Sequence, residues 1–146
     1  MDAEHIANKA SLSLAGAAAA VDAALAEATA MGVPITVVVV DESGNPKSMS
    51  RMDHAPLVSV TTATNKAFAA VTIGMPPDDF FEAIKEDAAA VASFATRPGL
   101  ALIAGGLPVV VDGAPVGAIG VAGAMTGAED RRIAEHAAAA INTART

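Results

Sequence analysis

The first thirty residues carry apolar side chains at a helical spacing. Such residues recur every three or four positions from Ile6 to Ala28, which places them on one stripe of a helix. The pattern predicts one long helix over residues 2–31. Asp2 is its expected N-cap, and Gly32 is its expected stop.

Further along the chain, two groups of short apolar runs predict strands. The run VPITVVVVD, residues 33–41, is β-branched and predicts a strand buried on both faces, and PKSMSRM, residues 46–52, predicts its hairpin partner. Three more strands are expected in ALIA, LPVVV and APVGAIGV, with Asp112-Gly113 as a hairpin turn between the last two.

Helical spacing returns between and after these groups of strands. Pro56 suits the first turn of a helix that Gly74 would end. The segment DDFFEAIKEDAAAV, residues 78–91, predicts one shorter helix. Thr126 and Glu129 fit a capping box at the start of a last helix.

This order of elements predicts an α+β fold with a mostly antiparallel five-stranded sheet flanked by helices. The length of 146 residues fits a single domain over residues 1–146. Seven of the twelve glycines fall between residues 104 and 130. Because glycine weakens a strand, we expect Gly105-Gly106 to shape a turn and Gly117 or Gly120 to let a helix lie close.

The composition of the chain argues against several kinds of functional site and partner. Without cysteine, the chain has no disulfides or thiol nucleophiles. A formal charge of −7 and the absence of Trp and Tyr argue against a nucleic-acid partner. No metal-ligand motif is present, so no metal site is expected. The N-terminus lacks a signal-peptide layout, and the longest uncharged run is too short to span a membrane, which together predict a cytoplasmic protein without a membrane partner.

Several segments together resemble the GlcG/HbpS-like haem-binding (haem-degrading) family. They are VVVVDESGNPKSMSRMDHAPL, ATNKAFAA, GMPPDDF, IAGGLPVVVDGAPVGAIGVAGA and the later ED before an Ala-rich helix. The resemblance spans about residues 5–141 and implies a profilin-like α-β-α layering, a homo-oligomer and an association with haem. Two positions depart from the family's pattern: His54 replaces a commonly small residue, and Ala122 replaces a frequent serine.

Three neighbouring residues at the end of the second predicted strand are the first candidates for chemistry. Arg51 and Asp53 share one face of a strand, where Arg51 could bind a carboxylate or a haem propionate. The alternative is a structural ion pair between Arg51 and Asp53. His54 stands at a strand-to-helix junction, where its imidazole could ligate iron or act as a base, or could simply be exposed in a loop.

The remaining candidates belong to the predicted helix after Pro56 and to the last helix. Lys66 either snorkels to the surface or, as the resemblance suggests, lines a pocket where it neutralises an anion or acts as a base. Asp130, in the first turn of the last helix, could transfer a proton. Gly123 and Gly127 would keep backbone N–H groups of that loop open to a ligand.

These candidates lead to one hypothesis of binding and one of catalysis. In the first, the chain binds haem or a related anionic ligand in one pocket formed by Arg51, Lys66 and the loop of Gly123 and Gly127, and losing either cation weakens binding with little loss of fold. In the second, a cofactor-independent isomerase, hydratase or hydrolase acts on a small carboxylate through His54, Lys66 or Asp130. A non-catalytic assembly or sensory role is the third possibility.

Overall fold

The computed structural model describes residues 3–143 and contains one four-stranded sheet. Its strands β1 (Thr36–Asp41), β2 (Pro46–Arg51), β3 (Gly106–Val111) and β4 (Ala114–Ala122) are all antiparallel to their neighbours, in the order β2-β1-β4-β3. The helices are α1 (Leu14–Met31), α2 (Val58–Ile73), α3 (Pro77–Ile84), α4 (Ala88–Ala95) and α5 (Gly127–Thr143). The predicted α+β class is therefore confirmed.

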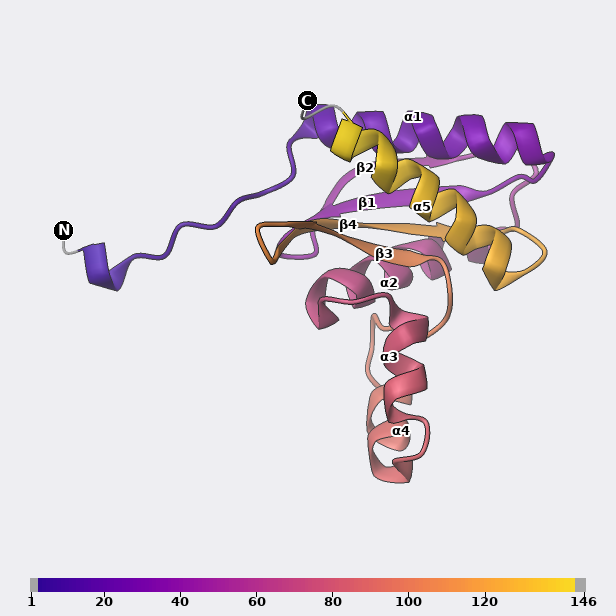
Figure 1. The fold of residues 1–146 in the computed structure, drawn as a ribbon. Helices are drawn as coiled ribbons and strands as arrows, with labels where there is room; N and C mark the ends of the chain where they lie inside the picture. The colour runs from indigo at the N-terminus through magenta and orange to yellow at the C-terminus, as the bar shows by residue number, and fades with distance from the viewer. Residues whose placement is uncertain (1–2, 144–146) are drawn as a thin grey trace.

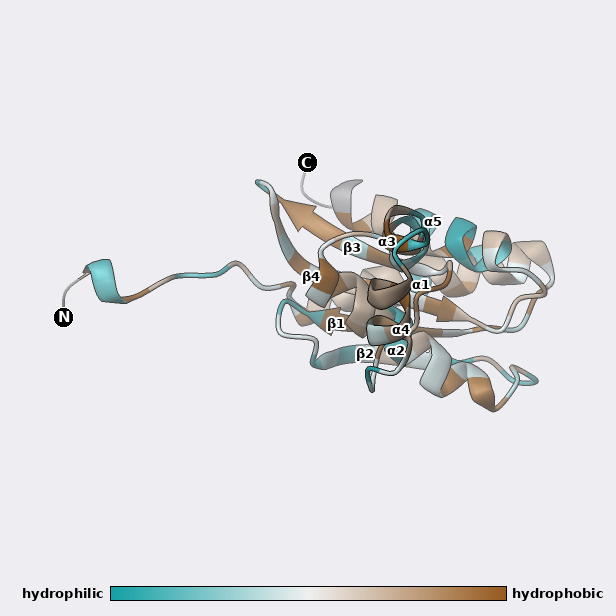
Figure 2. Ribbon diagram, turned by 90° about the horizontal axis from the view of Figure 1, so that it is seen from below, coloured by the Kyte–Doolittle hydropathy of each residue, from teal (hydrophilic) through white to brown (hydrophobic). Residues whose placement is uncertain are grey.

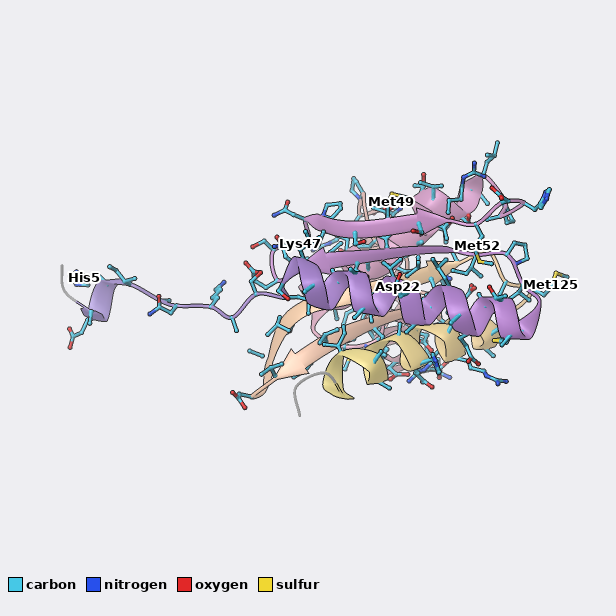
Figure 3. The ribbon with its side chains drawn as sticks, turned by 90° about the horizontal axis from the view of Figure 1, so that it is seen from above. His5, Asp22, Lys47, Met49, Met52 and Met125 are labelled. Carbon is cyan, nitrogen blue, oxygen red and sulfur yellow. The ribbon has the colours of Figure 1, made fainter. Side chains whose placement is uncertain are left out.

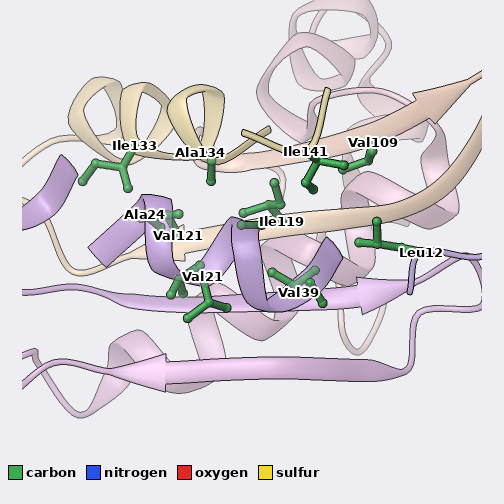
Figure 4. Packing of buried hydrophobic residues seen from close by; sticks show 14 of the residues in the cluster. Leu12, Val21, Ala24, Val39, Val109, Ile119, Val121, Ile133, Ala134 and Ile141 are labelled. Carbon is green, nitrogen blue, oxygen red and sulfur yellow. The ribbon is translucent and has the colours of Figure 1, made fainter. Parts of the chain in front are cut away.

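Helices cover both faces of this sheet. Helices α1 and α5 lie on one face, and α2 lies on the other (Figure 1). Successive side chains of β1 alternate between these layers, since Val37 and Val39 join the core under α1 and α5, whereas Val38 and Val40 face α2. Figure 4 shows the first of these cores. All four valines are fully buried, which explains why β1 reads as a continuous β-branched run.

The expected fifth strand is absent, so the prediction of a five-stranded sheet is wrong. The apolar segment ALIA, residues 101–104, runs as a loop, and β3 begins only at Gly106, where it pairs with Gly120. A run of four apolar residues fixes neither a strand nor burial, since Ile103 in this segment is 52% exposed. Gly105, with a φ of 123°, then turns the chain into β3. Whether the layering is related to that of profilin stays a prediction.

The long N-terminal helix is also shorter than predicted. Helix α1 begins at Leu14, where the Ser13 side chain caps it by accepting a hydrogen bond of 3.0 Å from the Gly16 N–H. The expected N-cap, Asp2, lies outside the described residues. Residues 3–11 are exposed and form an N-terminal arm. It begins with one short 3₁₀ turn that lies away from the body (Figure 1), and it reaches the body at residues 8–10, which border a hollow beside Val71 and Pro115. Nothing there covers an apolar stripe, so the periodicity does not produce a helix.

The segment predicted as one helix over residues 78–91 forms two. Helix α3 ends at Ile84, and the Asp87 side chain then caps α4 by accepting a hydrogen bond of 3.1 Å from the Ala90 N–H. An aspartate in this role starts a new helix instead of continuing the old one. The α3–α4 pair extends from the α2 side of the sheet, with α4 farthest from it (Figure 1).

Several glycine predictions are confirmed. Gly32 and Gly74 end α1 and α2 in the left-handed region, with φ of 72° and 86°. The turn between β3 and β4 has positive φ at both Asp112 and Gly113, as the hairpin signal required. At Gly120, β4 lies against the backbone of α2.

Apolar residues dominate strands β1 and β3 in the hydropathy colouring of Figure 2.

Helix α1 is long and apolar enough, by length and composition alone, to cross a membrane. In the fold its apolar side packs against the sheet and α5, and it buries Ala17, Ala20, Val21, Ala24 and Ala28. A core helix meets the same two criteria, so this helix gives no independent support for a membrane role.

Candidate functional site

Three loops meet at one end of the sheet, and we call this region the loop end. It comprises residues 32–35 before β1, residues 52–57 after β2 and residues 123–127 after β4. The Met52 N–H donates to the Ile35 carbonyl at 2.9 Å, which joins the first two loops. A Cβ at Gly123 would lie 3.0 Å from the Pro34 oxygen and 3.5 Å from the Pro56 Cδ. Met52 and Met125 accordingly lie at the same end of the molecule (Figure 3).

The most unusual polar feature near the loop end is a buried ion pair. Lys66 Nζ donates to Asp130 Oδ2 at 2.9 Å and to the Val121 carbonyl at 2.9 Å. The side chains of Lys66 and Asp130 are only 2% and 7% exposed. Lys66 is therefore not a surface lysine, and the sequence alternative of a snorkelling side chain is wrong.

Backbone groups complete the surroundings of this pair. The Ala124 N–H donates to Asp130 Oδ1 at 3.1 Å, so the loop leading into α5 offers one of its N–H groups to the protein's own carboxylate. A Cβ at Gly105 would lie 2.8 Å from Lys66 Nζ and 2.5 Å from the Val121 oxygen. Glycine at 105 is thus what lets the ammonium reach its partners, joining α2 on one face of the sheet to α5 on the other.

The electrostatics of the pair are dominated by burial. Removal from water raises the pKa of the Asp130 carboxyl above its ordinary value, because the charged form loses solvation. The hydrogen bond and charge of Lys66, together with the Ala124 N–H, oppose this rise and only partly offset it. The carboxylate therefore depends on Lys66, and such dependence is typical both of structural buried pairs and of catalytic acids and bases.

Arg51 ends β2, and Asp53 and His54 lie in the loop that follows it. All three are exposed, and within the described chain neither Arg51 nor Asp53 forms an ion pair, so the alternative of a structural Arg51–Asp53 pair is not seen. Arg51 and Asp53 border an open hollow of about 500 Å³, whose other lining residues are Leu25, Thr29, Ser50 and Met52.

His54 adopts an uncommon backbone conformation. Its φ is 70°, in the left-handed region, within a turn closed by the Ala55 N–H donating to the Met52 carbonyl at 3.1 Å. This conformation costs an L-residue other than glycine roughly 1–2 kcal/mol. Strain of this kind often persists at binding sites, although histidine tolerates the region better than most residues do.

The predicted site residues thus fall into two groups. Lys66 and Asp130 are in contact. Gly123 immediately precedes Ala124, whose N–H donates to Asp130. Gly127 begins α5 one turn before Asp130. Arg51 stands on β2 and Val121 on β4, two strand spacings or about 10 Å apart, and Lys66 and Arg51 share no cavity among those that the structure describes. That both cations act on one ligand stays a prediction.

Sequence reasoning did not identify the partners of Arg131. Its guanidinium donates to Asp78 at 2.7 Å, to Asp79 at 2.8 Å and to Glu135 at 3.0 Å. The network fixes the start of α3 against α5, and Arg131 holds the pKa of Asp79 below its usual value by hydrogen bonding. The only available signal was the spacing of four between Arg131 and Glu135. Within residues 3–143, no group of three or more His, Asp or Glu side chains is arranged to hold a metal ion.

Comparison with known proteins assigns the fold to a family. Residues 12–139 match the family model described as haem degrading protein HbpS-like. Protein GlcG of Escherichia coli strain K12 is 34% identical over 105 residues, which cover 72% of this chain and 76% of GlcG. The crystal structure of a double mutant of Streptomyces reticuli HbpS has a TM-score of 0.86 and 34% identity, covering 95% of this chain and 92% of that one.

Another similar solved structure is a complex with haem. The PduOC–heme complex has a TM-score of 0.82 and 28% identity, and the match covers 90% of this chain and 96% of that chain. The family match extends over most of the described residues, including β1 to β4 and the Lys66–Asp130 pair. The chain therefore belongs to the HbpS-like family of haem-degrading proteins.

Proposed function

We propose that this protein binds haem, or a related planar anionic ligand, at the hollow bordered by Arg51 and Asp53, with His54 following in the same loop. The observation that carries the proposal is that Arg51, which is exposed and forms no ion pair within residues 3–143, borders an open hollow of about 500 Å³. Support comes from the family and from the structural similarity to the PduOC–heme complex.

The residues around the hollow fit such a ligand. Leu25 and Met52 supply apolar contact, and Arg51 supplies a planar guanidinium suited to a propionate. The Met52 sulfur already accepts a hydrogen bond of 3.4 Å from the Ile35 N–H, so it serves the fold more than an iron ion. His54 is the accessible imidazole at this end and would be the iron ligand, while the bound haem would supply the redox chemistry.

Haemin titration, followed by visible absorption, tests this site. We expect a saturable Soret band for the unmodified protein. Arg51→Gln should weaken binding by about 10-fold or more, since a lost charged hydrogen bond typically costs about 1.5–3 kcal/mol. His54→Ala should shift the band as well as weaken binding.

Matched controls exist for both substitutions. Lys47→Gln removes another exposed cation of β2, and His136→Ala removes an exposed imidazole from α5, where it lies 3.6 Å from Glu27. Neither control should change the titration. Equal effects of His54→Ala and His136→Ala would show that His54 does not contribute to the site.

The buried Lys66–Asp130 pair favours a second candidate function. A carboxyl with a raised pKa beside an ammonium could exchange a proton with a small carboxylate substrate, without any cofactor. The pair is closed to solvent in the described chain, so a substrate would need the loop of residues 123–127 to move. A weak, non-saturating Soret band, together with hydrogen exchange of a small carboxylate in D₂O, would favour this candidate over haem binding.

We also propose that the protein assembles as a homo-oligomer. The alanine-rich sides of α1 and α5 pack against each other and against the sheet within the chain, so they are not free to pack against a second subunit. A different surface supports the proposal, because Leu57, Val58 and Met125 are 80%, 71% and 88% exposed around the loop end. Light scattering should give a multiple of 14.4 kDa, and a monomer mass at micromolar concentration would contradict it.

A further inference from the structure

A second cavity lies on the α2 side of the sheet, between α2, α4 and the loop that follows α4. It has a volume of about 510 Å³ and is lined by Phe68, Thr72, Ile73, Phe94, Arg97, Pro98 and Leu100. Its α2 residues belong to the C-terminal half of that helix, whereas the loop end adjoins its N-terminus. Since 16 residues of helix span about 24 Å, this cavity is separate from the hollow at Arg51.

The cavity gathers aromatic side chains in a chain that has few of them. The protein contains four Phe and neither Trp nor Tyr, and two of the four Phe line this one cavity. Both rings are positioned by close neighbours. A Cβ at Gly44 would lie 2.7 Å from the Phe68 ring, and Phe94 meets Phe80 edge to face with ring centroids 4.9 Å apart.

Arg97 gives the cavity a positive charge. Its guanidinium carbon lies 4.8 Å from the centroid of the Phe94 ring, which directs the cation over an aromatic face. No acidic side chain in the part of the chain that the structure describes forms an ion pair with it, although Arg131 and Arg132 are both paired. An unpaired arginine is notable in a protein with a formal charge of −7, where acidic partners are abundant.

From this arrangement we propose a binding site for a small aromatic carboxylate. The aromatic body packs between Phe68 and Phe94, and half-buried Ile73 and Leu100 extend the apolar wall. The carboxylate accepts hydrogen bonds from Arg97, whose planar fork matches its two oxygens. A single cation suits a monoanion, and apolar walls with one oriented charge are the usual composition of a small-molecule site. This inference does not depend on haem binding at the loop end.

An NMR titration of the isotope-labelled protein with naphthoate tests the proposal, with neutral naphthamide as the matched ligand. We expect saturable shifts confined to residues 68–73 and 94–100. Arg97→Gln should weaken naphthoate binding about 10-fold or more and leave naphthamide binding nearly unchanged. Arg132→Gln, an exposed arginine of α5 whose side chain is 68% exposed, should change neither. Because Arg97 is exposed, the variant should keep its fold, which its amide spectrum checks directly.

Three results would overturn this site. One is the absence of saturable shifts, and another is equal naphthoate affinity of the Arg97→Gln variant and the unmodified protein. The third is a change of mass in light scattering of a Phe94→Ala variant that keeps its native spectrum. That change would show that a second copy of the chain covers the cavity. Haemin binding is measured separately, so loss of either proposal leaves the other intact.

Discussion

Replacing Lys66 by alanine is expected to lower the free energy of unfolding by about 3–5 kcal/mol. The substitution would leave Asp130, whose side chain is 7% exposed, buried without its counter-charge, and breaking one side of a buried ion pair typically costs that much. It would also leave the Val121 carbonyl without the ammonium that now donates to it. Urea denaturation followed by circular dichroism measures the change, since the chain has no Trp or Tyr to provide fluorescence.

An exposed pair in the same protein provides the control. Lys85 donates to Glu82 at 2.6 Å, but the two side chains are 45% and 65% exposed, so Lys85→Ala should cost less than about 1 kcal/mol. Replacing both buried partners, as Lys66→Met with Asp130→Leu, should cost less than the two single substitutions added together. If Lys66→Ala lowered the free energy of unfolding no more than Lys85→Ala does, the Lys66–Asp130 pair would not hold α2 to α5.

Because Lys66 is part of a buried ion pair, its substitution can affect ligand binding through the fold. The sequence suggested that losing Lys66 would weaken ligand binding with little loss of fold. In the structure the ammonium already has two partners inside the protein, so a Lys66 variant that fails to bind ligand would first have to be shown to fold. Arg51 and Arg97 are exposed, and for them affinity can be measured without that ambiguity.

Gly120→Ala is the second substitution with a large expected effect, a loss of about 3 kcal/mol at the upper end of the usual range for overpacking. The added Cβ would overlap the Ala63 carbonyl oxygen and would lie 2.7 Å from the Ala67 backbone nitrogen. Both are backbone atoms of α2, so no side-chain rotation relieves the clash. The helix would have to move away from β4, opening the core between them.

A second glycine serves as the control for this experiment. At Gly127 a Cβ would lie 3.1 Å from the Ala104 Cβ and no closer than 3.9 Å to that residue's carbonyl oxygen. Gly127→Ala should therefore change the thermal midpoint much less than Gly120→Ala does. Similar midpoints for the two variants would mean that α2 can shift at little cost, contrary to the packing seen here.

Local signals allowed most of the fold to be predicted. The turn at Asp112-Gly113 and the helix stops at Gly32 and Gly74 depend on residues next to one another, where backbone preference decides the outcome. The two errors of element type, at residues 3–11 and 101–104, share a cause. Apolar spacing shows which side chains of a segment could be buried. Whether the segment forms a helix or a strand depends on whether another element packs against those side chains.

The candidate site was harder to predict because its parts are remote in sequence. Lys66 and Asp130 stand 64 positions apart, and neither has a neighbour in sequence that indicates the other. Gly105 was a usable signal, because a glycine before a strand indicates that something approaches the backbone. The group that approaches Gly105 is the ammonium of Lys66, and it can be identified only once α2 and β4 are placed in space.

The N-terminal arm gives experimenters a place to attach a reporter. Residues 3–11 are exposed, and the body begins at Leu12, whose N–H donates to the Val116 carbonyl at 2.8 Å. The family match begins at the same residue. A fluorophore or affinity tag attached along residues 3–7 would thus leave the core, the loop end and the Phe68 cavity unaltered. A cysteine introduced at Ala7 would be the chain's only thiol and would permit labelling at a single site.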